Sequence, residues 1–275
     1  MEQFKLPLGN YIEIFVDWLV DNGASFFDTI SESLEWMIRL FTDALLWLNP
    51  VAFITLVAAI ALYFRRSAGL AIYSVLALTL IWNLGYWVET MQTLVLVLYA
   101  TLFCMLIGLP IGIYSAHHPV FYQFLQPILD LMQTVPTFVY LIPTLTLFGL
   151  GVVPGLISTI VFAIAAPIRL TYLGISGVPE DIIEAGQSFG ATKRQILFRI
   201  ELPAAATSIA AGVTQCIMLS LSMVVIAALV GADGLGKPVV RALNTVDIAS
   251  GFEAGLAIVL LAILLDRIFK SRQEK

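Results

Sequence analysis

Seven long apolar stretches leave this chain few folds other than a bundle of membrane-spanning helices. Each is close to the roughly 20 apolar residues that an α-helix needs to cross the hydrocarbon core of a bilayer. Charged residues make up only 12% of the chain, against about a quarter in soluble domains. The sequence therefore predicts an all-α, multi-pass protein of the cell membrane. The stretches are approximately 48–64, 68–87, 92–115, 127–149, 153–174, 206–230 and 253–269.

The positions of Lys and Arg predict the orientation of these spans, because cytoplasmic loops carry an excess of both residues. Basic clusters directly follow the first span, lie in the polar stretch 176–206, and close the chain after 269. With seven spans, all three clusters share one side only if the N-terminus is outside and the C-terminus inside. Lys237 and Arg241 fall on the opposite side, but the majority predicts an N-out, C-in topology.

The segment 1–47 differs from the rest of the chain. Within it, residues 26–48 place apolar side chains at helical spacing on one face and mostly acidic side chains on the other. This pattern predicts an amphipathic helix on the outer membrane surface, in contact with the lipid bilayer. The sequence thus predicts two regions, an external interfacial segment over 1–47 and a transmembrane domain over 48–275 with an inner loop at 176–206.

No pattern of residues points to a catalytic centre, a metal site or a nucleic-acid-binding surface. Cys104 and Cys216 each lie inside an apolar stretch, where packing is the expected role. His117 and His118 follow the third span and are interpreted as a solvated loop pair. No nucleotide-binding motif occurs in the chain, so any chemical energy must come from another polypeptide.

The long inner segment 176–206 predicts a helix–turn–helix rather than a disordered loop. Pro179 suits the first turn of a helix, and Gly190 supplies a stop where a left-handed residue is easy. Thr192 can cap a second short helix through the residue three positions later. Pro203 is expected to end that second helix before the sixth span begins.

These residues resemble the cytoplasmic motif of binding-protein-dependent ABC permeases. That motif reads E-A-A, then G four residues on, then I-x-L-P ten residues after that. Gly186 departs from it, because the family usually has Ala there, and the glycine costs this helix about 1 kcal/mol. The matching residues are Glu184, Ala185, Gly186, Gly190, Ile200, Leu202 and Pro203.

The resemblance implies the fold of a type I ABC importer permease, a transport subunit rather than an enzyme. The inner loop would dock into a groove on a cytoplasmic ABC ATPase, with Glu184, Lys193 and Arg194 as polar contacts at the rim. It further implies two ATPase copies that bind ATP with Mg²⁺, a separate extracytoplasmic solute-binding protein, and a dimer of the permease itself. The permease would bind no cofactor. Pairing with a different permease chain stays open.

Further stretches are similar to permeases for glycine betaine, proline betaine and choline. They include LGYW at 84–87, LPIGIYSA at 109–116, QPILDLMQTVPTFVYLIP at 126–143 and the segment 230–263. This resemblance covers nearly everything from about residue 80 onward and implies import of quaternary ammonium compatible solutes. The loop 231–252 is interpreted as an outer gate or a docking surface for the binding protein.

The predicted fourth span is interrupted by prolines, which free backbone carbonyls from the helix. An ionised Asp130 near its inner end is costly unless it is paired or hydrated. We interpret the span as a bent helix that lines the translocation pathway, with a static kink as the alternative. The candidate pathway residues are Asp130, Pro136, Phe138, Tyr140, Pro143 and Phe148.

Other functions stay open at this point. A permease of the same architecture could carry another small solute, such as an amino acid or an inorganic anion. An autonomous secondary transporter or channel would be expected to carry paired repeats with broken helices or charges near mid-membrane, and no such repeat is visible. An intramembrane enzyme would need a catalytic pair within the spans, where no His occurs and Asp130 has no obvious carboxylate partner.

Overall fold

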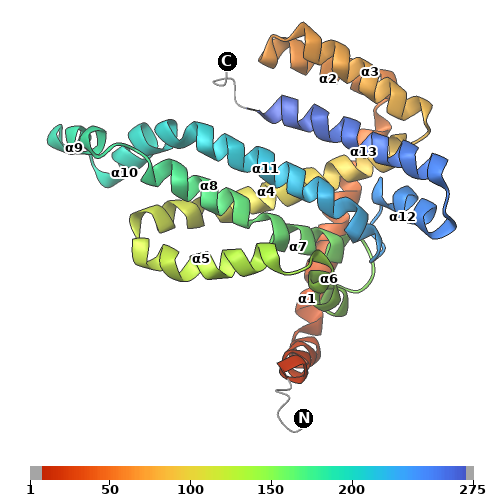
Figure 1. Ribbon diagram of the computed structural model, residues 1–275, viewed down its shortest axis with the longest axis horizontal. Coiled ribbons are helices and arrows are strands. Elements are labelled where there is room, and N and C mark those ends of the chain that lie inside the picture. Colours follow the sequence, from red (N-terminus) through yellow and green to blue (C-terminus); the bar gives the residue numbers. More distant parts are fainter. Residues whose placement is uncertain (1–7, 271–275) are drawn as a thin grey trace.

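The computed structural model describes residues 8–270, and all regular structure in this range is helical (Figure 1). The elements are α1 (Leu8–Trp47), α2 (Pro50–Arg65), α3 (Ala68–Asn83), α4 (Trp87–His117), α5 (Pro119–Thr134), α6 (Thr137–Phe148), α7 (Val152–Ala163), α8 (Ala165–Ser176), α9 (Glu180–Ser188), α10 (Lys193–Ile196), a π-helical turn (Leu197–Glu201), α11 (Leu202–Ala228), α12 (Gly236–Thr245) and α13 (Ile248–Phe269). The predicted all-α fold class is confirmed.

The centre of the bundle is α8, which packs against α4 on one side and α11 on the other. Glycines allow both contacts. A Cβ atom at Gly112 of α4 would lie 2.6 Å from Cβ of Thr171, and one at Gly174 of α8 would lie 2.8 Å from Cβ of Ser208. Small residues at such positions let membrane helices approach closely enough for backbone contact. These glycines therefore allow α4, α8 and α11 to pack as one unit.

Within residues 8–270, four helical stretches are long and apolar enough to cross a membrane, namely α4, α7 with α8, α10 through α11, and α13. The prediction that 127–149 forms one bent span is wrong in its boundaries. This region is the end of α5 and the whole of α6, which meet at an angle of 95°. Pro136 stands at the break and has no N–H to donate. α1 and α2 meet at a similar angle of 97°, and α3 has only 16 residues, so the number of spans stays a prediction.

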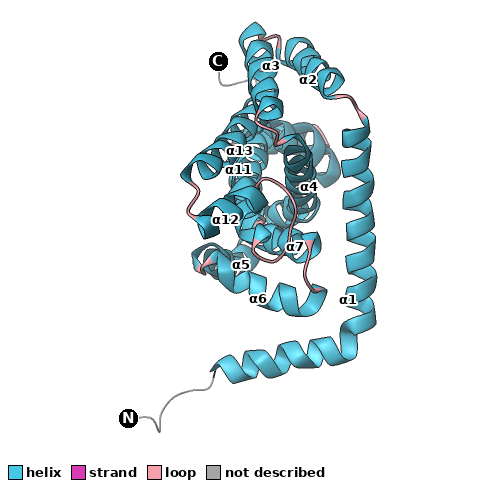
Figure 2. Ribbon diagram, turned by 90° about the vertical axis from the view of Figure 1, so that its right-hand side faces the viewer, coloured by secondary structure: helices cyan, strands magenta, loops and turns pink. Residues whose placement is uncertain are grey.

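The amphipathic helix predicted at 26–48 is part of α1, which begins at Leu8 and ends at Trp47. Figures 1 and 2 show α1 running crosswise to α4 and α11 along one side of the bundle. Its apolar face packs on α4 and α6 through Ile38, which is buried, and through an edge-on contact of Phe27 with Phe148. α1 is therefore attached to the bundle by its apolar face.

The basic clusters gather at one end of the bundle. The Tyr73 hydroxyl donates to the Leu260 carbonyl at 3.1 Å, and the Tyr86 hydroxyl donates to the Ser250 carbonyl at 3.5 Å. α3 and α13 therefore run antiparallel, which places the α2–α3 turn beside the last residues of α13. A cavity of about 290 Å³ lined by Thr207 and Lys270 joins that end of α13 to the start of α11. The predicted N-out, C-in topology requires the three basic clusters to lie at the same end of the bundle. Which side of the membrane this end faces stays a prediction.

Single-cysteine labelling tests that topology. In a background without Cys104 and Cys216, both buried, we expect Asn10→Cys to react with an impermeant maleimide added outside intact cells. Arg66→Cys should react only after permeabilisation, because it lies in the turn at the basic end. Labelling of position 66 but not position 10 from outside would contradict the orientation.

Candidate coupling and translocation site

The predicted inner helix–turn–helix begins with α9, whose ends follow from local sequence. Glu180 and Asp181 lie in its first turn, where the helix dipole favours negative charge. Gly190 has φ of +77° and ends the helix as predicted. Its N–H donates to the Gln187 carbonyl at 2.8 Å, and the next N–H donates to the Gly186 carbonyl at 3.1 Å. These two bonds form a Schellman motif, which satisfies carbonyls at the helix end.

The second helix starts as predicted but does not end as predicted. Thr192 and Gln195 form a reciprocal capping box at its start. Pro203 was expected to end it, whereas helical structure continues from Lys193 to Ala228. A π-helical turn at Leu197–Glu201 widens the helix directly before the proline, and the Leu202 N–H donates to the Leu197 carbonyl. The wider turn accommodates a ring that would clash with a regular α-helix.

Gly186, which departs from the usual alanine, lies where α9 packs against the π-helical turn. A Cβ atom at this position would come within 2.7 Å of Cδ1 of Ile200. Ile200 is half-buried, so two residues of the motif form the internal contact of this element. The glycine lets α9 lie closer to the turn, which offsets the helix propensity it loses.

The remaining motif residues are displayed on the surface. Glu184, Ala185, Lys193, Arg194 and Pro203 are exposed, and Leu202 is half-buried. Among them stand apolar side chains that the sequence analysis did not single out: Phe189 is 93% exposed, Phe198 58% and Ile182 46%. The Arg194 guanidinium lies 5.8 Å from the centre of the Phe198 ring. Exposed apolar groups rimmed by charges mark an interaction surface. In the sequence, the position of Phe189 directly before the motif residue Gly190 was the signal that could have indicated this exposed apolar surface.

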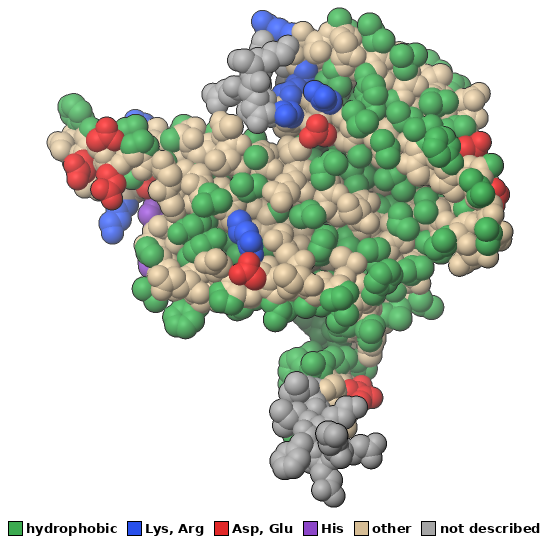
Figure 3. Space-filling view, in the orientation of Figure 1, with side chains coloured by type: hydrophobic (Ala, Val, Ile, Leu, Met, Phe, Trp, Pro, Cys, Tyr) green, Lys and Arg blue, Asp and Glu red, His purple; other side chains and the backbone are tan. Residues whose placement is uncertain are grey.

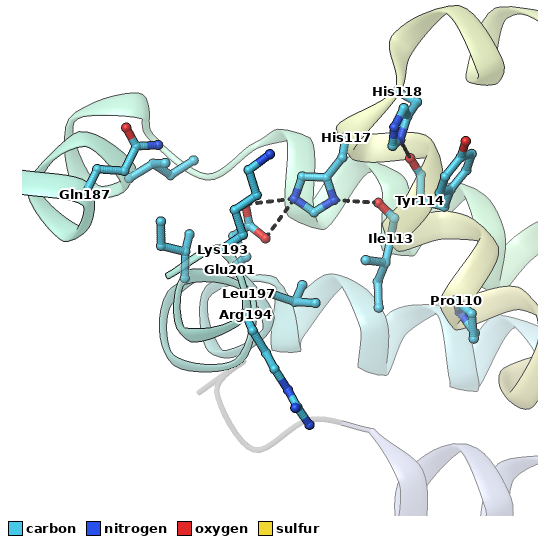
Figure 4. A pocket seen from close by; sticks show the side chains of 12 residues that line it. Pro110, Ile113, Tyr114, His117, His118, Gln187, Lys193, Arg194, Leu197 and Glu201 are labelled. Carbon is cyan, nitrogen blue, oxygen red and sulfur yellow. Dashed lines mark hydrogen bonds and ion pairs between the residues drawn. The ribbon is translucent and has the colours of Figure 1, made fainter. Parts of the chain in front are cut away.

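His117 is exposed as expected, with 42% of its side chain accessible, but it belongs to a helix and not to a loop. It ends α4, and its Nε2 lies 3.0 and 3.1 Å from the two carboxyl oxygens of Glu201, while Nδ1 lies 2.9 Å from the Ile113 carbonyl (Figure 4). Glu201 is only 5% exposed. The contact ties the π-helical turn to α4.

A cavity of about 880 Å³ lies beside this pair, between the end of α4 and the helices α9 and α10. Figure 4 shows His117 and Glu201 meeting across it, with Pro110 and Tyr114 lining the α4 side. The cavity is mostly apolar, and Lys193 and Arg194 lie at its polar margin. The element formed by α9, α10 and the π-helical turn is therefore only partly packed on the bundle, with open space between it and α4.

The broken fourth span holds the candidate pathway residues. Asp130 is exposed on α5 and pairs with Arg169 of α8 at 2.5 Å. The sequence analysis missed this partner, although Arg169 stands inside an apolar stretch. The Tyr140 hydroxyl donates to the Met132 carbonyl at 2.8 Å, so it occupies the carbonyl that Pro136 leaves free. Tyr140 of α6 thus stabilises the break by a hydrogen bond to the end of α5.

The other candidates on α6 have different surroundings. Phe138 is 56% exposed, and Pro136 is also exposed at the break. Pro143 lies inside α6 and is half-buried. Phe148 ends α6 and contacts Phe27 of α1 edge-on, with ring centroids 5.4 Å apart. The structure therefore places Phe138 and Pro136 on an open face and Phe148 at the attachment of α1.

A polar cavity of about 470 Å³ lies at the opposite end of the bundle. The predicted gate or docking loop 231–252 forms part of it through α12. Asp247 caps α13 by accepting bonds from the Ser250 N–H and hydroxyl, and these bonds lower the pKa of its carboxyl group. Residues from α4, α12 and the start of α13 thus form one polar surface there, lined by Glu89, Gln92, Asp233, Lys237, Arg241 and Asp247.

The glycine-packed bundle of apolar helices, with an exposed helical element at one end and a broken helix at its face, has the architecture of a multi-pass membrane protein. Residues 108–271 match the family described as "Binding-protein-dependent transport system inner membrane component". The chain belongs to this family and is the membrane-spanning permease subunit of an ABC importer. It is a transport subunit and not an enzyme.

Relatives match along almost the whole chain. The chain is 42% identical over 271 residues to the glycine betaine transport system permease protein OpuAB of Bacillus subtilis, covering 98% of this chain and 96% of that protein. It is 43% identical to the glycine betaine/proline betaine permease protein ProW of Escherichia coli, covering 96% and 74%. The MetNI methionine ABC transporter in inward-facing form shares the fold, with a TM-score of 0.58, 22% identity, and 63% and 87% coverage.

The pairing of His117 with Glu201 can be tested by stability. We expect His117→Leu to lower the free energy of unfolding by about 1–3 kcal/mol, because it leaves the nearly buried Glu201 carboxyl group without this partner, while the exposure of His117 reduces the strength of the pair. Thermal unfolding of the purified protein in detergent, followed by intrinsic fluorescence, measures the change. His118→Leu is the matched control, since His118 is exposed and bonds only the Tyr114 carbonyl. Equal midpoints for the two variants would contradict a stabilising pair.

Proposed function

We propose that this permease imports glycine betaine and related quaternary ammonium compatible solutes. The observation that carries the proposal is the 42% identity along nearly the whole chain to a glycine betaine permease protein. Two further relatives support the same chemistry, since one is a glycine betaine/carnitine permease and another a trimethylamine N-oxide permease. All these solutes carry a nitrogen with no N–H, so they are recognised by ring faces and charge rather than by donated hydrogen bonds.

We propose three partners for the permease. A cytoplasmic ABC ATPase, present in two copies, would bind ATP with Mg²⁺ and receive α9 and the residues around it. Exposed Phe189, Glu184 and Arg194 support this docking, because an apolar group within a charged rim suits a protein interface. A separate solute-binding protein would dock at the opposite end, on the polar surface around α12. A second copy of the permease would complete the pathway.

The packing suggests how movement would pass from the ATPase to the pathway. α9 contacts the π-helical turn through Gly186 and Ile200. That turn continues into α11 without a break and is tied to α4 through Glu201. α11 and α4 both pack on α8. A displacement of α9 would therefore move these three helices together, with the broken α5–α6 span as the flexible element of the pathway.

In the proposed arrangement the pathway is lined by the open face at the α5–α6 break. Asp130, Pro136 and Phe138 are its exposed residues, whereas Tyr140, Pro143 and Phe148 hold the shape of the broken span. The segment 1–47 would lie along the outer membrane surface as an anchor for the domain 48–275. Its crosswise course in Figure 2 supports this placement.

Another small solute is the alternative, because the motif around α9 is shared by permeases of different substrates. The fold likeness to a methionine transporter is compatible with an amino acid. The long, higher-identity matches to betaine permeases favour the quaternary ammonium solutes.

Two substitutions test the docking element. We expect Glu184→Lys and Gly190→Trp to reduce uptake at least about tenfold, since the first reverses a rim charge and the second puts a bulky side chain at a φ of +77°. Uptake by cells and the amount of permease in isolated membranes are measured together. Glu13→Lys, on the distant start of α1, is the control. Normal uptake by both variants would contradict the coupling role.

The solute is tested in proteoliposomes that hold the permease, its ATPase and its binding protein. We expect ATP-dependent accumulation of radiolabelled glycine betaine, which unlabelled proline betaine competes. ATP hydrolysis stimulated by another solute, without betaine uptake, would retain the importer and replace the substrate. Uptake without the ATPase would contradict the proposed partnership.

A further inference from the structure

An exposed polar stripe runs along α5, a helix whose other residues are mostly apolar. Gln123, Gln126, Asp130 and Thr134 recur every three or four residues and are all exposed. Phe124, which is 75% exposed, belongs to a different face of the same helix. Polar and charged groups at membrane depth are costly against lipid and occur where they face water or other polar groups. The stripe therefore belongs on a hydrated surface.

Asp130 of this stripe pairs with Arg169 of α8, and not all hydrogen-bond donors of the arginine have a partner. Nη2 of Arg169 lies 2.5 Å from Oδ1 of Asp130, and the two side chains are 29% and 53% exposed. Figure 3 shows a neighbouring cation and anion over α8 and α5, in a surface otherwise formed by apolar and uncharged groups. Nε of Arg169 is buried and has no partner among the described residues. A guanidinium has five N–H donors, so donors remain for another acceptor.

Two tyrosines lie beside the pair. The rings of Tyr122 on α5 and Tyr172 on α8 stack in parallel, with centroids 3.5 Å apart and an interplanar angle of 9°. Tyr172 is one helical turn from Arg169 on α8, and Tyr122 is two turns from Asp130 on α5. Each ring is half-buried. Tyrosine ring faces on the same two helices as the charged pair are suitable surfaces for a cation that cannot donate hydrogen bonds.

We propose that Asp130, Arg169 and the Tyr122–Tyr172 stack form a transient binding site for the solute within the pathway. The solute carboxylate would pair with the free donors of Arg169. The quaternary ammonium would lie against Asp130 and a tyrosine face. The inference rests on the proposed function, because it requires a zwitterionic solute with both groups close together.

The pair itself selects this charge pattern. A simple cation would draw Asp130 away and leave the Arg169 guanidinium unpaired at membrane depth, and a simple anion would do the reverse to Asp130. A zwitterion offers one partner to each residue, so neither charge is left alone. Replacing the contact between Asp130 and Arg169 by contacts with the solute therefore costs little free energy, and so does the reverse. A site in a translocation pathway needs this property, because it must release its solute as readily as it binds it.

The test uses the complete transporter in proteoliposomes and measures glycine betaine uptake and binding-protein-stimulated ATP hydrolysis on the same sample. For Arg169→Gln and Asp130→Asn we expect uptake to fall about tenfold or more, with ATP hydrolysis within about twofold of the unmodified protein. Tyr122→Phe should retain uptake, whereas Tyr122→Leu should lower it. Arg39→Gln is the control, because it removes an arginine–carboxylate pair elsewhere in the chain, the exposed i,i+4 pair of Arg39 with Glu35 within α1.

The charge exchange Asp130→Arg with Arg169→Asp separates binding from structure. A purely structural pair would be restored by the exchange, so recovered uptake would overturn the proposal. Parallel loss of uptake and ATP hydrolysis in the single variants, or normal uptake in both, would overturn it as well. Absence of betaine uptake by the unmodified complex would instead contradict the proposed solute class, and the zwitterion site with it.

Discussion

The close packing of α8 between α4 and α11 is the contact on which the rest of the structure depends. In a bilayer, apolar surface gains nothing by leaving lipid for protein, so helix association relies on van der Waals contact at small residues. Gly112 and Gly174 provide such contacts, since any side chain there would overlap Thr171 or Ser208. The three helices therefore behave as one unit, and the functional elements are attached to its ends and its face.

The element formed by α9, α10 and the π-helical turn is joined to these three helices at two points, which differ in kind. One is continuous backbone, because the helix of the second inner segment runs through a π-helical turn into α11. The other is the polar contact of Glu201 with His117, which reaches across to α4. A force on α9 consequently reaches two of the three central helices directly. Because of the large cavity beside the contact, α9 and α10 are packed less closely on the bundle than α4 and α11 are.

The fourth span contrasts with the rigid centre. Pro136 breaks it, Tyr140 occupies a carbonyl that the break exposes, and Asp130, six residues before Pro136, is paired with Arg169. Discontinuous helices with ionisable groups at membrane depth are typical of solute pathways in transporters. A rigid three-helix unit beside a broken helix is an arrangement in which movement of the former can change access along the latter.

The sequence by itself determined the helical class, the apolar stretches, and the start and stop signals at Thr192 and Gly190. These depend on side-chain polarity and on backbone preferences of neighbouring residues, which act locally. Only the tertiary structure decided that the helix continues past Pro203, because a π-helical turn had to form next to it. The same holds for contacts between residues far apart in the chain. His117 meets Glu201 across 84 positions and Asp130 meets Arg169 across 39, and no local pattern specifies which helices bring such side chains together.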